Sequence, residues 1–225
     1  LGSSPPRLGH LSLLTDISGE GLSKRLGSLS LKDLRQEGFQ PMAISSLLSK
    51  VGTSDAVDIF KNINQIIDDF DINKFGKSKP KFDKMELLNL NSKFFQLIDF
   101  DDISGQLNTL DFEITTEFWN LIKGNINTFN DIKFWWDIVY GKIKTINDDH
   151  EFTHLALKTL PNDSFDKNTW STWTSLLMKE SGRKGKDLFK PLRLCLTGQN
   201  NGPEMANLVL TMGRQKIVER LNNKN

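Results

Sequence analysis

Helix start and stop signals recur along this chain from residue 30 onward, and they constrain its fold more than any other feature. Ser30 followed by Asp33 has the spacing of a capping box, and Gly38 ends the apolar pattern that follows. Pro41 suits the first turn of a second helix, which Gly52 ends. Between such signals, apolar residues recur three and four positions apart, as on one face of a helix. The pattern predicts a mainly α protein.

The same signals predict the remaining helices. Ser54 opens a pattern that continues to Ile67, and Asp83 with Glu86 indicates the start of a helix that runs to Leu97. Further helices are predicted at about 115–123, 129–140, 149–160, 167–180, 186–197, and as a last pair divided by Gly213.

Two segments lack a helical pattern. In residues 1–28, Pro and Gly flank the short apolar run Leu11–Leu14, which indicates strand and loop. Residues 98–112 are acidic and weakly patterned, and we interpret them as a domain junction. A chain of 225 residues is long enough for one large or two small domains.

Composition excludes several classes of protein. No apolar run approaches the ~20 residues of a membrane-spanning helix, and the first residues lack the pattern of a signal peptide. The single cysteine, Cys195, excludes an intrachain disulfide and a zinc site built from cysteines. We therefore expect a cytoplasmic protein without membrane association. Because the chain starts on Leu rather than Met, we expect it to be a piece of a longer protein.

Charge is distributed unevenly, although the net charge is only +1. Residues 98–178 hold six Lys and Arg against 13 Asp and Glu, whereas residues 179–225 hold ten against four. A basic segment of this kind can attract a polyanion such as a nucleic acid. A solvated charged surface explains the same numbers equally well.

Aromatic residues and histidines have structural explanations. The run "FWWDIVY" could stack on unpaired bases, but Phe134 and Ile138, like Trp136 and Tyr140, stand at helical spacing. We therefore favour core packing for this cluster. Two of the three histidines, at positions 150 and 154, have a spacing that can hold a metal, but no third ligand is near, and we expect no metal site.

A polar loop, "GEGLSKRLGSLSL" at residues 19–31, precedes the first predicted helix. Glycines allow positive φ and let backbone N–H groups approach a ligand. Lys24 is a mobile charge that can follow a phosphate. These residues suit triphosphate chemistry, but a loop of this composition is far more often an ordinary surface loop.

The stretch "PPRLGHLSLL…GEGLSKRLGSLSLKDLRQEGFQPMAISSLLSKVG" resembles the end of the catalytic domain of bacterial glutamyl-tRNA synthetases. In that family the class I signature Lys-Met-Ser-Lys-Ser takes the form Lys-Leu-Ser-Lys-Arg. The match places Ser23, Lys24 and Arg25 on this signature and differs at Gly21, where the family has Lys.

A second stretch, "GRKGKDLFKPLRLCLTGQNNGPEMANLVLTMGRQKIVERL", resembles the C-terminal end of the same enzymes. The segment "KFDKMELLNLNSKFF" stands where the family has its Leu-Asn segment, while residues 100–165 correspond by position only. The resemblance therefore implies the C-terminal half of a glutamate–tRNA ligase, which is inactive alone because the nucleotide-binding domain precedes it.

The resemblance implies three regions: residues 1–25 end the catalytic domain, residues 26–97 contact the tRNA stem, and residues 98–225 form an α-helical anticodon-binding region. It implies that Lys24 is catalytic and contacts the phosphates of ATP, with Mg²⁺ sharing this role, and that Ser23 and Arg25 also bind ATP. Either Arg25 partly replaces the missing first lysine, or that contact is dispensable.

The resemblance implies a monomer whose partners are L-glutamate and tRNA(Glu). Whether it also recognises tRNA(Gln) is not decided by the sequence. The candidates for RNA contact are Arg183, Lys184, Lys186, Arg193 and Arg214. Each also fits a solvated helix face or, for Arg193, an internal salt bridge. Two alternative functions are a stand-alone tRNA-binding module and a helical protein-interaction scaffold.

Overall fold

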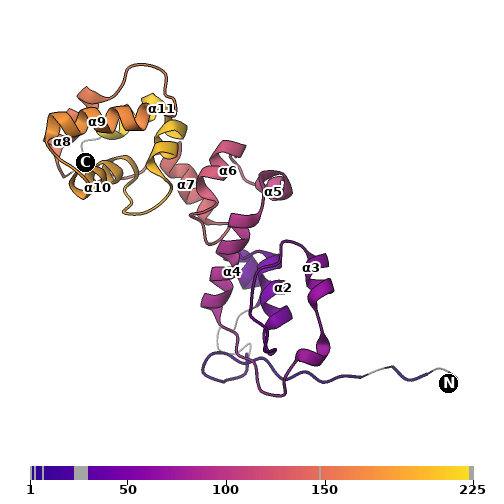
Figure 1. Cartoon of the computed structure of the whole chain (residues 1–225). Helices are drawn as coiled ribbons and strands as arrows, with labels where there is room; N and C mark the ends of the chain where they lie inside the picture. The colour runs from indigo at the N-terminus through magenta and orange to yellow at the C-terminus, as the bar shows by residue number, and fades with distance from the viewer. Residues whose placement is uncertain (1, 3, 7, 23–29, 147, 223–225) are drawn as a thin grey trace. The chain divides into compact units, whose positions relative to one another are not determined.

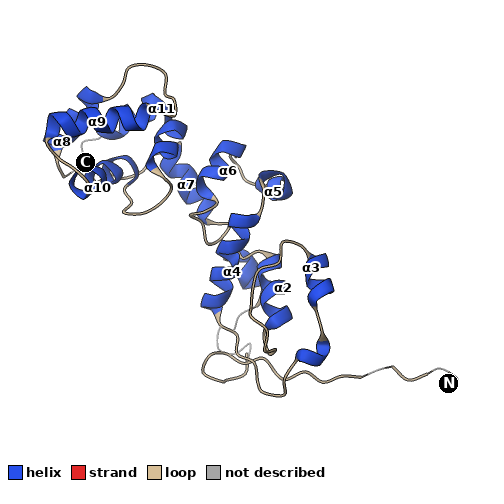
Figure 2. Ribbon diagram, in the orientation of Figure 1, coloured by secondary structure: helices blue, strands red, loops and turns tan. Residues whose placement is uncertain are grey.

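The computed structural model describes residues 2, 4–6, 8–22, 30–146 and 148–222. The protein is mainly α, as the helix signals predict, and Figure 2 shows helices joined by loops. The helices are α1 (Leu31–Gln36), α2 (Pro41–Lys50), α3 (Ile63–Asp69), the 3₁₀ helix η2 (Ile72–Lys74), α4 (Lys84–Leu97), α5 (Phe100–Leu107), α6 (Thr116–Ile122), α7 (Asp131–Val139), α8 (His150–Thr159), α9 (Thr169–Ser181), α10 (Lys186–Thr197) and α11 (Met205–Asn222).

The chain divides into two compact units. The first comprises Leu1–Ile98 with Asn127–Phe129, and the second comprises Asp99–Ile126 with Asn130–Asn225. Figure 1 labels α2, α3 and α4 of the first unit and α5 to α11 of the second. None of the helices in the described ranges is long and apolar enough to cross a membrane.

The first unit is built around the packing of α2 against α4. The predicted capping box at the start of α1 is confirmed: the Ser30 hydroxyl accepts from the Asp33 N–H at 3.1 Å, and Asp33 accepts from the Ser30 N–H. The core of this unit consists of Leu34, Phe39, Ala43, Leu47, Phe82, Leu87 and Leu90.

A buried amide side chain joins three segments of the first unit. Asn91 on α4 is fully buried, and its Oδ1 accepts from the Gln40 N–H at 2.7 Å. Its Nδ2 donates to the Asn127 carbonyl at 2.5 Å, and the Phe129 N–H donates to the Gly38 carbonyl at 2.9 Å. These bonds explain why residues 127–129 belong to this unit.

The helix predicted from Ser54 is wrong over its first half, because α3 begins only at Ile63, after the Asn62 cap. Residues 55–59 instead alternate between half-buried and exposed positions, and Val57 and Ile59 pack on the core. Alternation with a period of two indicates extended backbone. The ion pairs of Asp55 with Lys50 and Lys74, each 2.9 Å, hold the start of this segment.

Two further expectations are corrected. Residues 98–112 are not without regular structure, because they contain α5, on which Ile103 and Leu107, four positions apart, are buried. The strand expected around Leu11–Leu14 is not formed in the described residues, where only isolated bridges of Thr15 occur. Thr15 itself is buried, and its carbonyl accepts from the Phe82 N–H at 2.8 Å.

The second unit is organised around α11, which contacts α6, α7, α8, α9 and α10. The predicted division of its last helical segment at Gly213 is confirmed, since this residue has φ 71° and ψ 164° within α11. Leu208, Met212 and Ile217 on either side of this kink are buried.

Arg220 places a charge inside this unit. Its side chain has no exposed surface, and its Nη2 donates to the carbonyls of Ile138 at 3.1 Å and Gly141 at 2.9 Å. A weaker contact reaches the Asp137 carbonyl at 3.4 Å. These carbonyls lie at the C-terminal end of α7, where the helix dipole favours a cation. Burial lowers the pKa of Arg220.

We predict that Arg220→Met destabilises the chain by about 2–4 kcal/mol, because it leaves the carbonyls at the end of α7 without a charged donor. Urea denaturation followed by circular dichroism would measure the free energy of unfolding. Arg35→Met is the matched control, because Arg35 is exposed, and a change within about 0.5 kcal/mol is expected there. Equal effects of the two substitutions would contradict this role of Arg220.

Candidate nucleic-acid interface

Helix α10 carries two of the five candidates for RNA contact, Lys186 and Arg193, and two more, Arg183 and Lys184, lie shortly before it. It follows Gly185, whose φ is 52°, and ends at Gly198, whose φ is 68°, both positions that favour glycine. Leu188, Leu192 and Leu196, each four residues apart, are buried without any exposed surface. This buried face leaves Lys186, Asp187, Phe189 and Lys190 of α10 exposed.

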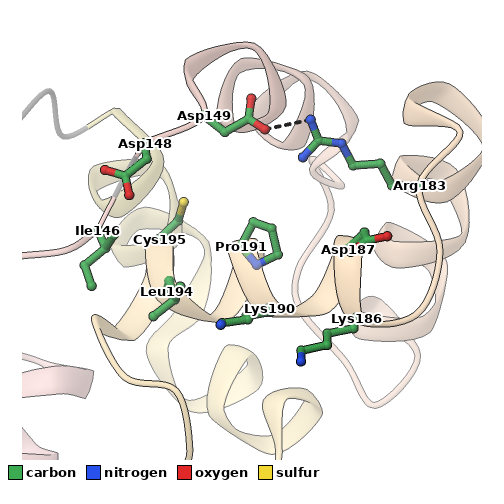
Figure 3. Close-up of a pocket in the computed structure, with 10 residues that line it drawn as sticks. All are labelled: Ile146, Asp148, Asp149, Arg183, Lys186, Asp187, Lys190, Pro191, Leu194 and Cys195. Carbon is green, nitrogen blue, oxygen red and sulfur yellow. Dashed lines mark ion pairs between the residues drawn. The ribbon is translucent and has the colours of Figure 1, made fainter.

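A pocket of about 780 Å³ lies beside α10 (Figure 3). Its lining combines three acidic, three basic and four other residues: Ile146, Asp148, Asp149, Arg183, Lys186, Asp187, Lys190, Pro191, Leu194 and Cys195. The equal number of acidic and basic side chains gives this pocket no strong preference for an anion or a cation.

Arg183 is engaged within the protein. It forms an ion pair with Asp149 at 2.6 Å (Figure 3). It also lies over the Phe152 ring, 4.7 Å from the ring centroid. Asp149 also caps α8 by accepting from the Phe152 N–H at 3.0 Å. This backbone hydrogen bond, with the Arg183 side chain second, lowers the pKa of Asp149. Arg183 therefore orders the start of α8 as well as lining the pocket.

Of the other four candidates for RNA contact, three lie on α10 or just before it. Lys184 and Lys186 are exposed, and neither pairs with a carboxylate within the described part of the chain. Arg193 donates from Nη2 to the Pro203 carbonyl at 3.0 Å. Its Nη1 is buried and finds no hydrogen-bond partner among the described residues, and burial lowers the pKa of Arg193.

Arg214 is placed apart from α10, directly after the kink of α11. Its Nε donates to the Pro161 carbonyl at 3.0 Å, and its Nη2 donates to Asn162 Oδ1 at 2.7 Å. The side chain therefore braces the loop that follows α8. Because these bonds occupy only part of the guanidinium and the residue is exposed, an RNA contact by Arg214 stays a prediction.

The predicted ATP-contacting residues Ser23, Lys24 and Arg25 lie outside the described residues, but the residues that flank them are described. Gly21 is exposed and paired with Thr15, while Ser30 caps α1. A Cβ added at Gly21 would meet no atom within 4 Å, and its φ is not positive. A lysine, as in the resembling family, would therefore fit at position 21.

The expectation of core packing for the aromatic cluster of α7 is confirmed only in part, because Trp135 is buried and Trp136 half-buried, whereas Phe134 and Tyr140 are exposed. Trp135 is buried and donates to the Asn125 carbonyl at 3.1 Å, and Trp136 packs on Phe112 with ring centroids 4.9 Å apart. Phe134 is exposed. In the chain as described, no group of three His, Cys, Asp or Glu residues could hold a metal ion.

Sequence reasoning missed Phe189 and Lys190 on α10 and Trp170 on α9. Phe189 follows Lys186 by three positions and Lys190 follows it by four, which places them on one side of a helix. This spacing was available in the sequence, but the contact between Phe189 and Trp170 was not, because it joins two helices.

Comparison with known proteins identifies the family. The family model described as "Anticodon binding domain" matches residues 86–224. The chain belongs to the anticodon binding domain family. The match extends over α5 to α11 and includes every one of the five candidates for RNA contact.

Relatives among curated proteins support the resemblance to glutamyl-tRNA synthetases. The chain is 39% identical over 222 residues to glutamate–tRNA ligase 1 of Maricaulis maris, covering 98% of this chain and 50% of that protein. It is 40% identical over 223 residues to glutamate–tRNA ligase of Azospirillum brasilense, with the same coverage of both. The chain thus spans about half the length of the curated relatives it matches.

A solved structure supports the fold. The glutamate tRNA ligase from Elizabethkingia meningosepticum, in complex with its amino acid, superposes with a TM-score of 0.78 at 20% identity. The superposition covers 98% of this chain and 51% of that one.

We predict that Cys195 reacts slowly although it lines the pocket. Burial raises the pKa of its thiol to about 11, so at pH 8 the reactive thiolate is about 100-fold scarcer than for an ordinary cysteine. Release of the coloured product of Ellman's reagent would measure the rate, with the chain unfolded in guanidinium as the control. A native rate within about threefold of the unfolded rate would contradict a protonated, buried thiol.

Proposed function

We propose that this chain is the C-terminal, tRNA-binding half of a glutamate–tRNA ligase. The complete protein activates L-glutamate with ATP and transfers it to tRNA(Glu), whereas the chain alone is inactive. The observation that carries the proposal is the family match over residues 86–224 together with relatives near 40% identity that share this name. We assign residues 26–97 to contact with the tRNA stem and residues 98–225 to anticodon binding.

Helix α10 supports RNA binding by this half. The Pro203 carbonyl holds the Arg193 guanidinium through Nη2 at 3.0 Å, and the part of this half-buried side chain that stays exposed is available to an RNA group. A planar guanidinium fixed in this way suits recognition of a base edge. Lys184 and Lys186 are exposed cations that suit phosphates, which position an RNA without reading its sequence. Arg183 and Arg214 are assigned secondary contacts because both already bind protein groups.

The signature loop supplies the contribution of this chain to chemistry. Lys24 contacts the phosphates of ATP and stabilises the charge of the departing pyrophosphate, with Ser23 and Arg25 beside it. The flanking residues Gly21 and Ser30 are exposed, which is compatible with a ligand from outside this unit. Mg²⁺ supplies further positive charge on the phosphates, and we assign no ligand for it to this chain.

The remaining parts of the proposal concern the cell and the partners. We propose that the complete enzyme is a cytoplasmic monomer. Charging of purified tRNA(Glu) and purified tRNA(Gln) by the complete protein would show whether it also recognises tRNA(Gln).

We predict that Lys186→Ala weakens binding of tRNA(Glu) and of an unrelated tRNA by the same factor, because a phosphate contact carries no sequence information. Filter binding at several salt concentrations measures this, and the slope of log K against log salt should fall by about one. Lys158→Ala on α8 is the matched control, since Lys158 is an exposed lysine outside α10, and it should leave the slope unchanged.

Two outcomes of this experiment decide between functions. Absence of tRNA binding by the wild-type chain at low salt would favour the protein-interaction scaffold. Binding by the wild type with an unchanged slope for Lys186→Ala would remove Lys186 from the interface while leaving tRNA binding in place.

We predict that Lys24→Ala in the complete protein lowers glutamate-dependent ATP–pyrophosphate exchange on the order of 10²–10³-fold, because one charge contact to the transition state is lost. Affinity for tRNA should change little, since the loop is far along the chain from α10. Unchanged exchange would remove the catalytic assignment of Lys24. It would also favour the stand-alone binding module if no nucleotide-binding domain precedes the chain in frame.

A further inference from the structure

Four residues of α10 form one outward face. Counted from Lys186, Phe189, Lys190 and Arg193 lie three, four and seven positions along, spacings that align side chains on one side of a helix. Phe189 retains 38% of its surface, so part of its ring is open to a partner. An aromatic ring thus stands among three cations on a single helical surface.

The Phe189 ring is supported from behind by a second helix. Trp170 on α9 contacts it with ring centroids 6.0 Å apart and planes at 34°. Trp170 in turn meets Trp173 edge to face, at 6.0 Å and 83°. Trp173 is fully buried and donates to the Ala156 carbonyl at 2.9 Å. A chain of ring contacts therefore connects the exposed ring to a fixed core residue.

The lysines on this face have no carboxylate partner. Neither Lys186 nor Lys190 forms an ion pair within the ranges that the structure describes, unlike Arg183 with Asp149. Figure 3 shows both lysines extending to the same side of α10, away from that ion pair. Their charge is therefore available to an anionic partner.

We propose that Phe189, supported by Trp170, is a stacking platform for one unpaired base of a bound RNA, with Lys186 and Lys190 on the adjoining phosphates. This rests on the proposed function and deepens it by naming the contact for a splayed base. Single-stranded RNA is bound in this way, through rings on which bases stack and cations that follow the backbone. The ring accepts any base, so the platform adds affinity rather than sequence preference.

An RNA fits this face better than a protein partner. Lysines are depleted in the centre of protein interfaces, whereas here they flank the only large apolar side chain on this face of α10. The exposed apolar area is that of one ring, which matches the face of one base rather than a protein surface.

The test compares Phe189→Leu with Phe134→Leu in the full chain of 225 residues. Phe134 is the matched control, because it is 46% exposed, belongs to the same unit and also contacts a tryptophan, Trp135, at 5.2 Å. The probe is a hairpin RNA with the anticodon stem and loop of tRNA(Glu), and a blunt RNA duplex of equal length serves as the paired reference.

We expect Phe189→Leu to weaken hairpin binding about 5- to 100-fold, as loss of one base stack does, and to leave duplex binding unchanged. Phe134→Leu should bind both RNAs like the wild type. Quenching of tryptophan fluorescence by the hairpin should be smaller in Trp170→Phe than in the wild type, because Trp170 lies next to the stacked base. Thermal unfolding of each variant checks that the fold is retained.

The outcomes separate the two proposals. If the wild type binds the hairpin and Phe189→Leu binds within about twofold of it, the platform is refuted while tRNA binding stands. If both RNAs lose affinity equally, Phe189 supports the helix rather than a base, and the platform is again refuted. If the wild type binds neither RNA at low salt, the platform and the proposed function fall together.

Discussion

The buried guanidinium of Arg220 is the interaction on which the second unit depends. A charge without water is costly unless it is hydrogen-bonded, and here the carbonyls of Ile138 and Gly141 receive it at 3.1 and 2.9 Å. Gly141 has to be glycine for this arrangement, because a Cβ would lie 2.9 Å from the Asp137 Cα. The Gly141 carbonyl also accepts from Lys216 at 3.2 Å, so two cations of α11 converge on one turn.

Through packing, this constraint also affects the face of α10 that we propose binds RNA. Because α11 contacts α6 to α10, fixing its position also fixes the helix against which α10 packs. The buried leucines of α10 then determine which of its side chains point outward. Side chains on a packed helix lose little conformational entropy when they bind a partner. This small entropy cost favours affinity, whereas a flexible segment would lose more conformational entropy for each contact it made.

The sequence predicts the elements whose signals are local. The capping box of Ser30 and the kink at Gly213 depend on neighbouring residues, and both were correctly read. The prediction of a helix directly after Ser54 is wrong for two reasons. The alternating pattern of Val57 and Ile59 is too short to distinguish an extended segment from a helix by sequence. The ion pairs of Asp55 that hold this segment involve Lys50 and Lys74, which lie outside it.

The candidate interface likewise depends on contacts between segments that are distant in the sequence. The charge excess of residues 179–225 indicates a candidate region, but it does not show which of these charges lack a partner within the protein. The contact between Trp170 and Phe189 and the bond from Arg193 to Pro203 each require tertiary structure. The platform therefore could not be distinguished from an ordinary helix face by its spacing alone.

Internal pairing makes the basic segment less available to RNA than its composition indicates. Arg183 and Lys216 pair with carboxylates, while Arg193, Arg214 and Arg220 donate to protein carbonyls. Among the described residues of the basic segment 179–225, the lysines without a carboxylate partner are Lys179, Lys184, Lys186 and Lys190. Because counterion release depends on the number of phosphates that cations neutralise, we expect these four lysines to supply most of the salt-dependent part of the proposed RNA affinity. A small electrostatic contribution of this kind leaves stacking and base-edge contacts to supply much of the binding energy, which is the condition under which one exposed ring on α10 can have a measurable effect.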